Sequence, residues 1–399
     1  MTTKTVLPPR RVALLVITLC WVVVVFDGYD LIVYGTVLPR LLTEPGWNLT
    51  PSSAGLLGSL AFAGMLIGAV LAGTLADRIG RRRMVILCSL WFSVFTALCA
   101  VAIGPVSFGA LRFVAGLGLG GLVPSASALT AEFVSPRYRS LVATLMMSGV
   151  PVGGCVAALV GIVVLPDFGW RPMFAISLLA VLVVPAAMKF LPESPQWRPD
   201  QDKAPLRELI RPQYRRATVL FALTTVVTLF TWYGLSTWLP QLMRTSGVDV
   251  GSALTFLLAL QLGAVAGSLL TAWAGTRFGP VRTGIAAAAA AAVGLFLPVT
   301  GPSPAVVYGA MVLAGIGTHG TQCLVIAAVA THYPARLRGA ALGFSLGFGR
   351  IGAVLAPQVG GWLLAAGLGI NANFLVFAAA AAIAAALLAI SPREGVIQS

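Results

Sequence analysis

Residues 73–83 read GTLADRIGRRR, and residues 275–282 read GTRFGPVR, which is a weaker copy of the same pattern. The copy lies 199 positions after the original, so that Arg78 corresponds to Arg277. The same shift relates further pairs: AGLG at 115–118 and AGIG at 314–317, Tyr34-Gly35 and Tyr233-Gly234, and Arg139 and Arg338. An internal repeat of this length predicts that the chain consists of two related structural units.

The composition places both units in a membrane. Of the 399 residues, 58% are hydrophobic and only 10% are charged, and the mean hydropathy is +0.94. A helix needs roughly 20 mostly apolar residues to cross a bilayer. Proline, glycine and charge clusters divide the chain into twelve such stretches: 12–38, 52–76, 84–103, 105–131, 138–164, 170–190, 217–243, 250–275, 281–299, 303–330, 338–366 and 371–391. We therefore expect an all-α membrane protein with twelve transmembrane helices.

The distribution of basic residues predicts the orientation of these helices. The chain carries 26 lysines and arginines and a formal net charge of +14. Most of the basic residues fall at one set of loop ends, and only Arg40, Arg171 and Arg244 fall at the opposite ends. Because cytoplasmic loops carry an excess of Lys and Arg, both termini are expected in the cytoplasm.

The repeat and the spans together predict two parallel bundles. Residues 1–191 form the first six-helix bundle, 192–216 a cytoplasmic linker rich in charge and proline, and 217–399 the second bundle. Two bundles that rock against each other about a site near the middle of the membrane are typical of alternating-access transporters. The sequence holds no nucleotide loop, metal-site spacing or nucleophile-and-base pattern, and its five cysteines lack paired spacing. We expect neither an enzyme nor a cofactor.

Charged residues inside the predicted spans are the first candidates for function. Asp27, Asp30 and Tyr34 follow one helical stripe of the first span. Arg112 and Arg350 are the basic residues that fall within spans. Charges at this depth are costly unless they are paired, hydrated or protonated, which marks them as functional candidates. A carboxyl group between a neighbouring acid and a movable arginine suits proton coupling, and we assign this role to Asp27, Asp30 and Arg112; the alternative is a structural ion pair between the first and fourth spans.

Arg350 lies near the middle of the eleventh predicted span, with Gly343 and Gly347 on its face. A lone positive charge there needs an anion, and a substrate can supply it. The alternative is a bond to backbone carbonyls at a helix break near Pro357. We favour a substrate contact.

Aromatic and polar side chains predict the rest of a substrate site. Trp232, Tyr233 and Trp238 lie in the seventh span, although Trp238 also fits an anchor at the membrane interface. His319 and Gln322 share a face of the tenth span. Aromatic walls with a few polar groups suit a planar ligand. The predicted substrate-binding residues are Asp30, Tyr34, Trp232, Tyr233, Trp238, His319, Gln322 and Arg350.

Several of these motifs resemble a known superfamily. GTLADRIGRRR is similar to the signature loop of the major facilitator superfamily, RFVAGLGLGG at 112–121 to its span-four arginine motif, and EFVSPRYRS at 132–140 and HYPARLRG at 332–339 to its loops after spans four and ten. The resemblance implies conformational gating at these loops. The residues to which we assign gating are Gly73, Asp77, Arg78, Arg82, Glu132 and Arg139.

Within that superfamily, DGYDLIVYG at 27–35 and YGLSTWLPQLM at 233–243 resemble the aromatic acid:proton symporter family, which imports benzoate, hydroxybenzoates and protocatechuate into bacteria. The resemblance implies that Asp27 and Asp30 are needed for transport, that Arg112 belongs to the coupling machinery, and that the proton is the coupling ion. It also implies a multi-pass protein of the bacterial inner membrane that works without nucleic acid, and we expect a monomer. GVPVGG at 149–154 partly resembles a motif of drug:proton antiporters, but we interpret it as helix packing with a bend at Pro151.

Three alternatives remain open from the sequence. The protein can be a proton-driven exporter of drugs or organic acids on the same fold. It can import other carboxylates, such as muconate, although a second carboxylate should need a second cationic contact. A membrane sensor is a third alternative, but the linker and the tail are too short for a signalling domain.

Overall fold

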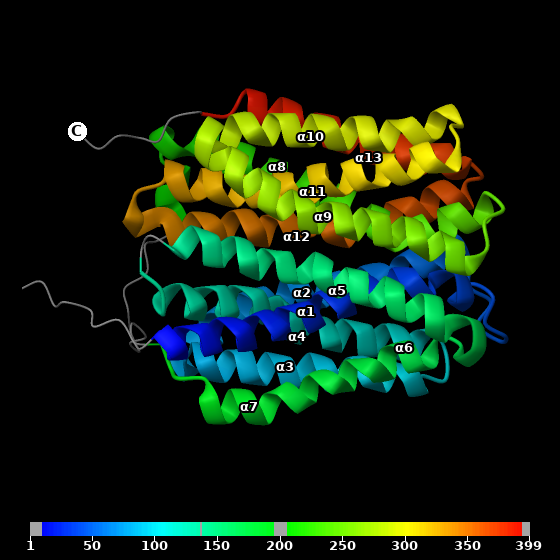
Figure 1. Cartoon of the computed structure of the whole chain (residues 1–399), viewed down its shortest axis with the longest axis horizontal. Coiled ribbons are helices and arrows are strands. Elements are labelled where there is room, and N and C mark those ends of the chain that lie inside the picture. The colour runs from blue at the N-terminus through cyan, green and yellow to red at the C-terminus, as the bar shows by residue number, and fades with distance from the viewer. Residues whose placement is uncertain (1–9, 136–137, 195–205, 393–399) are drawn as a thin grey trace, which may run out of the picture.

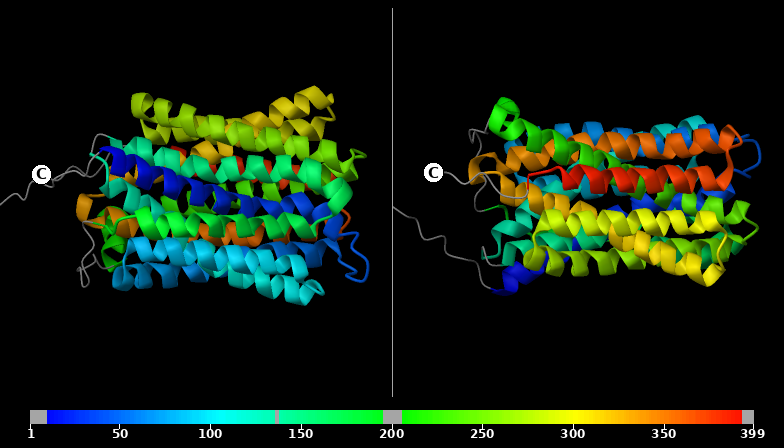
Figure 2. Two further views of the ribbon diagram at one scale, coloured as in Figure 1. Left: turned by 60° about the horizontal axis from the view of Figure 1, so that its bottom comes forward. Right: turned by 90° about the horizontal axis from the view of Figure 1, so that it is seen from above.

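The computed structural model describes residues 10–135, 138–194 and 206–392. Its helices run side by side along the long axis of the molecule (Figures 1 and 2). Twelve helices in the described part of the chain are long and apolar enough to cross a membrane. The predicted fold class and number of spans are therefore confirmed.

The first half of the chain forms the lower bundle of Figure 1. Prolines at the first helical position begin several of its helices, where their missing N–H is not needed. At α2 the residue before the helix, Thr50, also forms a capping box with Ser53. The elements are α1 (Arg10–Leu41), α2 (Pro51–Ile79), α3 (Arg81–Leu98) with the 3₁₀ turn η1 (Cys99–Val101), α4 (Pro105–Glu132), α5 (Arg139–Phe168), and a sixth span made of α6 (Arg171–Ala175), η3 (Ile176–Leu182) and α7 (Val183–Phe190).

The second half forms the upper bundle. Its elements are η4 (Leu206–Ile210), α8 (Pro212–Thr245), α9 (Val250–Phe278), α10 (Pro280–Phe296) with η5 (Leu297–Thr300), α11 (Pro304–His332), α12 (Ala335–Ala365) and α13 (Gly369–Ala389). Helix α8 begins at Pro212 and so includes the last five residues of the predicted linker, among which Tyr214 is already buried. An ion pair of 2.5 Å between Glu208 and Arg336 also fixes η4 to α12. The end of the predicted linker thus packs on the second bundle.

Glycines hold the same pair of helices together in each half. A side chain at Gly64 of α2 would meet the Phe113 carbonyl of α4 at 2.0 Å, and one at Gly263 of α9 would meet the Val312 carbonyl of α11 at 2.2 Å. Both members of the second pair lie 199 residues after those of the first. Such contacts bring helix backbones together as small residues do in membrane helices. The sequence repeat is therefore also a repeat of helix packing.

The two halves are packed together at one end of the molecule, which we call the far end. It lies opposite the end where α1 begins and α13 finishes (Figure 1), which we call the basic end because most of the arginines lie there. At the far end, Arg244 donates a hydrogen bond of 2.9 Å to the Pro39 carbonyl, and Gln358 donates one of 3.3 Å to the Ser52 carbonyl. A side chain at Gly35 would lie 2.2 Å from the Ser236 carbonyl of the other half. These contacts close the far end.

Glycines leave open space along α12 toward the basic end. Gly339, Gly343 and Gly347 follow one stripe of α12 that leads from the basic end to Arg350. Among described residues, no heavy atom lies within 4 Å of the position that a side chain would take at any of these three glycines. The same holds for Gly73 near the basic end of α2. The three glycines thus leave open space along α12 between the basic end and Arg350.

Candidate functional site

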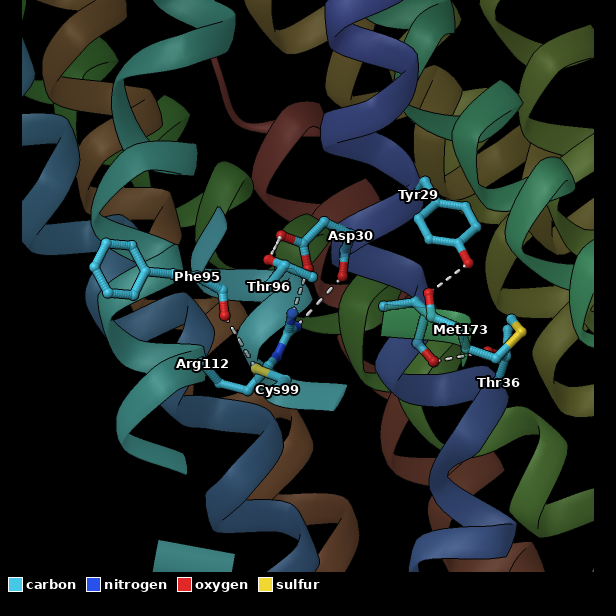
Figure 3. Close-up of polar contacts among 9 residues, drawn as sticks. Tyr29, Asp30, Thr36, Phe95, Thr96, Cys99, Arg112 and Met173 are labelled. Atoms are coloured by element: carbon cyan, nitrogen blue, oxygen red, sulfur yellow. Dashed lines mark hydrogen bonds and ion pairs between the residues drawn. The ribbon is translucent and has the colours of Figure 1, made fainter. Parts of the chain in front are cut away.

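The carboxylate of Asp30 is bound within the first half, between α1, α3 and α4 (Figure 3). It forms an ion pair with the guanidinium of Arg112 and accepts a hydrogen bond of 2.5 Å from the Thr96 hydroxyl. The side chains of Asp30 and Arg112 are 0% and 1% exposed. Arg112 also donates to the main-chain oxygen of Asp30 at 3.4 Å. The ion pair joins the first and fourth spans. This contact is compatible with both interpretations from the sequence, proton coupling and a structural ion pair.

Asp27 is in a different situation from Asp30, although it lies one helical turn away. It is fully buried, and neither carboxylate oxygen has a hydrogen-bond partner among the described residues. It interacts electrostatically with Asp30 in its own helix and with Arg350 in the opposite half. A buried carboxylate without a hydrogen-bond partner is costly in its charged form, and a proton removes that cost. The proton-coupling role assigned to Asp27, Asp30 and Arg112 stays a prediction.

Arg350 reaches from α12 across the interface into the first half. Its guanidinium donates to the main-chain oxygen of Met65 in α2 at 3.2 Å and to that of Gly120 in α4 at 3.4 Å. It forms no ion pair with a described residue and interacts electrostatically with Tyr233 and Asp27. Backbone carbonyls do bind it, as the alternative from the sequence held, but they lie in the other half and not at Pro357. Its contact with a substrate stays a prediction.

Aromatic side chains flank these charges. The rings of Tyr233 and Phe62, from opposite halves, lie 4.5 Å apart, and those of Trp232 and His319 lie 5.3 Å apart. Tyr233 also interacts electrostatically with Asp27 and Arg350. We call Asp27, Phe62, Tyr233 and Arg350 the central cluster. It combines apolar ring faces, one carboxyl group and one guanidinium between the two halves.

His319 and Gln322 lie one turn apart in α11 and are buried. The Nε2 atom of His319 and both amide atoms of Gln322 have no hydrogen-bond partner among the described residues. Buried polar atoms are seldom left without partners in proteins. These atoms are therefore suited to bind polar groups of a ligand, and their role in substrate binding stays a prediction.

The structure does not bring Tyr34 and Trp238 to the central cluster. The Tyr34 hydroxyl donates to the Ala54 carbonyl of α2 at 2.5 Å, in the closed far end. Trp238 is fully buried, and its Nε1 donates to the Pro357 carbonyl of α12 at 2.8 Å. In this conformation both side chains serve helix packing, because the prolines and small residues of α2 and α12 leave room for a large ring. Full burial within the second half also rules out an interfacial anchor at Trp238 in this conformation.

The predicted gating loop is held within the first half. Glu132 forms an ion pair with Arg81, which was not among the predicted gating residues, and accepts a hydrogen bond from Ser194. Arg82 instead donates through its backbone N–H to Glu193 at 3.0 Å and through its side chain to the Met188 carbonyl. Asp77 interacts electrostatically with Arg81, whereas Gly73, Arg78 and Arg139 are exposed. Their role in gating stays a prediction.

Three residues of this region were not predicted from the sequence. Gln261 of α9 is fully buried, donates weakly to Ser236 at 3.5 Å, and has an Oε1 atom without a partner among the described residues. Its side chain fills the space left by Gly154 of the opposite half, which explains one glycine of the GVPVGG segment. A glutamine within an apolar span could have been recognised from the sequence as a candidate. Thr96 and Glu193 carried no comparable signal, because their partners lie far away in sequence.

Comparison with known proteins then gives the family. A family model described as Major Facilitator Superfamily matches residues 20–262 and again residues 222–397. This chain belongs to the major facilitator superfamily. It is accordingly a membrane transporter and a multi-pass protein of the bacterial inner membrane. Among solved structures, a D-xylose–proton symporter superposes with a TM-score of 0.79 at 19% identity, over 95% of this chain and 98% of that one.

Three similar sequences carry names that state a substrate. A gentisate transporter of Corynebacterium glutamicum is 53% identical over 395 residues, covering 96% of this chain and 88% of that protein. A benzoate transport protein of Acinetobacter baylyi is 33% identical over 399 residues, covering 90% and 85%. A 4-hydroxybenzoate transporter of the same organism is 30% identical over 424 residues, covering 96% and 91%.

Proposed function

We propose that this chain is a proton-coupled symporter that imports an aromatic carboxylate, with gentisate, a dihydroxylated benzoate, as the first substrate to test. The similarity to a gentisate transporter over nearly the whole chain supports the substrate class. The observation that carries the mechanism is the central cluster. There, a buried carboxyl group without a hydrogen-bond partner among the described residues, Asp27, faces a guanidinium, Arg350, that forms no ion pair with a described residue.

The substrate carboxylate would bind Arg350. A guanidinium offers a planar fork of N–H donors that matches a carboxylate, and bonds to a charged acceptor are stronger than bonds to a neutral one. The ring would then lie against Phe62 and Tyr233, whose rings are 4.5 Å apart between the halves. His319 and Gln322 supply polar atoms for ring hydroxyls.

Charge balance explains why a proton would accompany the substrate. With Asp27 protonated, the positive charge of Arg350 and the negative charge of the substrate cancel, so that the loaded cluster is neutral. Without the proton, the bound substrate adds a second buried negative charge beside Asp27, which is unfavourable at this depth. Binding of one carboxylate therefore favours binding of one proton. Asp30 stays paired with Arg112 and acts on Asp27 through its charge.

The orientation of the chain indicates which conformation the structure represents. We assign the basic end to the cytoplasm, because most of the arginines and lysines lie at that end. The open space beside the glycines of α12 lies toward this end, which supports a state from which substrate would be released inward. Import then requires that the far end open to receive the next substrate.

Uptake into proteoliposomes tests the proposal. An inward proton gradient should accumulate labelled gentisate, and a protonophore should abolish the accumulation. Asp27→Asn should abolish it as well, because an amide cannot release a proton. The matched control is Asp249→Asn, an exposed helix cap at the far end, which should transport normally. Import by proton symport is refuted if accumulation persists with the protonophore, or if substrate accumulates only under an outward proton gradient.

A dicarboxylate such as muconate fits the central cluster less well. In the part of the chain that the structure describes, the arginines buried within spans are Arg112 and Arg350, and Arg112 is already paired with Asp30. A second carboxylate would therefore lack a cationic partner. Competition experiments should show that benzoate-type acids inhibit gentisate uptake more strongly than muconate does.

A further inference from the structure

Two prolines of the first half leave helix carbonyls without their usual donor. In an α-helix, each carbonyl accepts a hydrogen bond from the N–H four residues later, and proline has no N–H. Pro124 lies inside α4, and Pro151 lies inside α5. They free the carbonyls of Gly120 and Met147, respectively.

Each freed carbonyl is met by a side chain from the second half. Arg350 of α12 donates to the Gly120 carbonyl at 3.4 Å. His319 of α11 interacts with the main-chain carbonyl of Met147. Both side chains cross the interface between the halves, and both belong to the predicted substrate site. Two independent prolines thus create acceptors for the two side chains expected to hold the substrate.

The packing of α4 on α2 gives Arg350 its second acceptor. A side chain at Gly120 would lie 2.4 Å from the Met65 carbonyl, so only glycine allows this approach. The Met65 carbonyl lies beside that of Gly120 as a result, and the two N–H arms of one guanidinium reach both, at 3.2 Å and 3.4 Å. The first half therefore presents two neutral carbonyl acceptors, side by side, to the guanidinium of Arg350.

We propose that the proline-freed carbonyls of Gly120 and Met147 are placeholder ligands, which hold Arg350 and His319 until a substrate displaces them. This inference rests on the proposed function, in which Arg350 binds the substrate carboxylate. A carboxylate is a stronger acceptor than a neutral carbonyl, so the exchange is favourable. Part of the binding energy is nevertheless spent on releasing the carbonyls. Pro124 and Pro151 are therefore positioning residues that lower substrate affinity and link binding to separation of the halves.

Gentisate binding to the purified protein in detergent, measured by titration calorimetry, tests this inference. Pro124→Ala restores an N–H to α4, which satisfies the Gly120 carbonyl within its own helix and frees Arg350. We expect the Kd to fall about fivefold, the equivalent of one competing hydrogen bond. Pro124→Ser should act in the same way, because the N–H and not the side chain is responsible. Pro166→Ala is the matched control, since Pro166 lies inside α5 but is exposed near the far end, and should leave the Kd unchanged.

The direction of the change separates this role from a structural one. A proline that merely shapes α4 would weaken binding or leave it unchanged when replaced, and either result for Pro124→Ala and Pro124→Ser overturns the inference. If neither variant folds, Pro151→Ala decides by the same criterion through His319. Arg350→Gln separates failure of the placeholder role from failure of the proposed substrate site. If it loses binding while the proline variants bind like the wild type, only the placeholder role fails, whereas normal binding by Arg350→Gln refutes the proposed substrate site itself.

Discussion

Replacing Asp30 by Asn should lower the stability of the protein, whereas the same substitution at Asp27 should leave it nearly unchanged. Asp30→Asn leaves Arg112 buried and without its counter-charge, in a place where both side chains are at most 1% exposed. Asp27→Asn removes a carboxylate that has no hydrogen-bond partner among the described residues. Both variants should lose proton-driven accumulation. Only Asp30→Asn should also lose stability.

The expected size of the loss follows from the burial of the pair. Removing one partner of a buried ion pair costs about 3 to 5 kcal/mol, because the remaining charge is uncompensated. For a bundle of the size of the first half, a loss of about 3 kcal/mol corresponds to a fall in Tm on the order of 6 to 12 °C. For Asp27→Asn we expect a change of less than about 1 kcal/mol, as for most substitutions that remove no partner.

Thermal unfolding of the detergent-purified variants, followed by tryptophan fluorescence, measures this difference. The double variant Asp30→Asn/Arg112→Met should recover most of the lost stability, because replacing a whole buried pair by a neutral one is far less costly than breaking it. Asp249→Asn again serves as the matched control. Equal melting temperatures for Asp27→Asn and Asp30→Asn would show that the ion pair between α1 and α4 does not hold the first bundle together.

Three further outcomes are expected. Gly64→Ala should reduce the yield of folded protein measured by size-exclusion chromatography, since overpacking costs about 1 to 3 kcal/mol or more. Gly73→Ala should give a normal yield, because the space near Gly73 is open. Equal yields would contradict the role of Gly64 in packing α2 on α4. Trp238→Phe should lower the Tm, because loss of the hydrogen bond to α12 reduces the stability by about 1 kcal/mol. The affinity for gentisate should stay unchanged. A weaker affinity would show that Trp238 contributes to the substrate site. A short cross-linker between Ser52→Cys and Gln358→Cys should lock the far end and stop uptake, and continued uptake by fully cross-linked protein would show that the far end need not open.

The sequence was sufficient for the architecture because membrane burial leaves few choices. Backbone polar groups must be satisfied within each span, so an apolar stretch of sufficient length becomes a helix. Prolines, glycines and charges then mark the ends, as at Pro51, Pro105 and Pro304, where helices begin. The break of the sixth span into α6, η3 and α7 was not predicted. Its apolar sequence gives no sign of where 3₁₀ geometry replaces α geometry.

The candidate site was predicted in composition but not in its pairings. Asp27 and Asp30 share a stripe of α1, but three residues of an α-helix still separate their directions by about 60°. This rotation is enough to turn Asp30 toward Arg112 and Thr96 within the first half, while Asp27 interacts with Arg350 across the interface. No local pattern reveals such a division, because every partner lies on another helix. The same limit applies to Arg81, whose ion pair with Glu132 was not predicted.

The glycine contacts that recur after 199 residues have an evolutionary consequence. They join α2 to α4 and α9 to α11 through backbone atoms, and none of them uses Asp27, Asp30 or Arg350. After an ancestral duplication, each copy could keep its glycine contacts while the residues between the two halves diverged freely. Selection for a new nutrient would then act on a few side chains without endangering assembly, which suits a scaffold whose descendants carry many different cargoes.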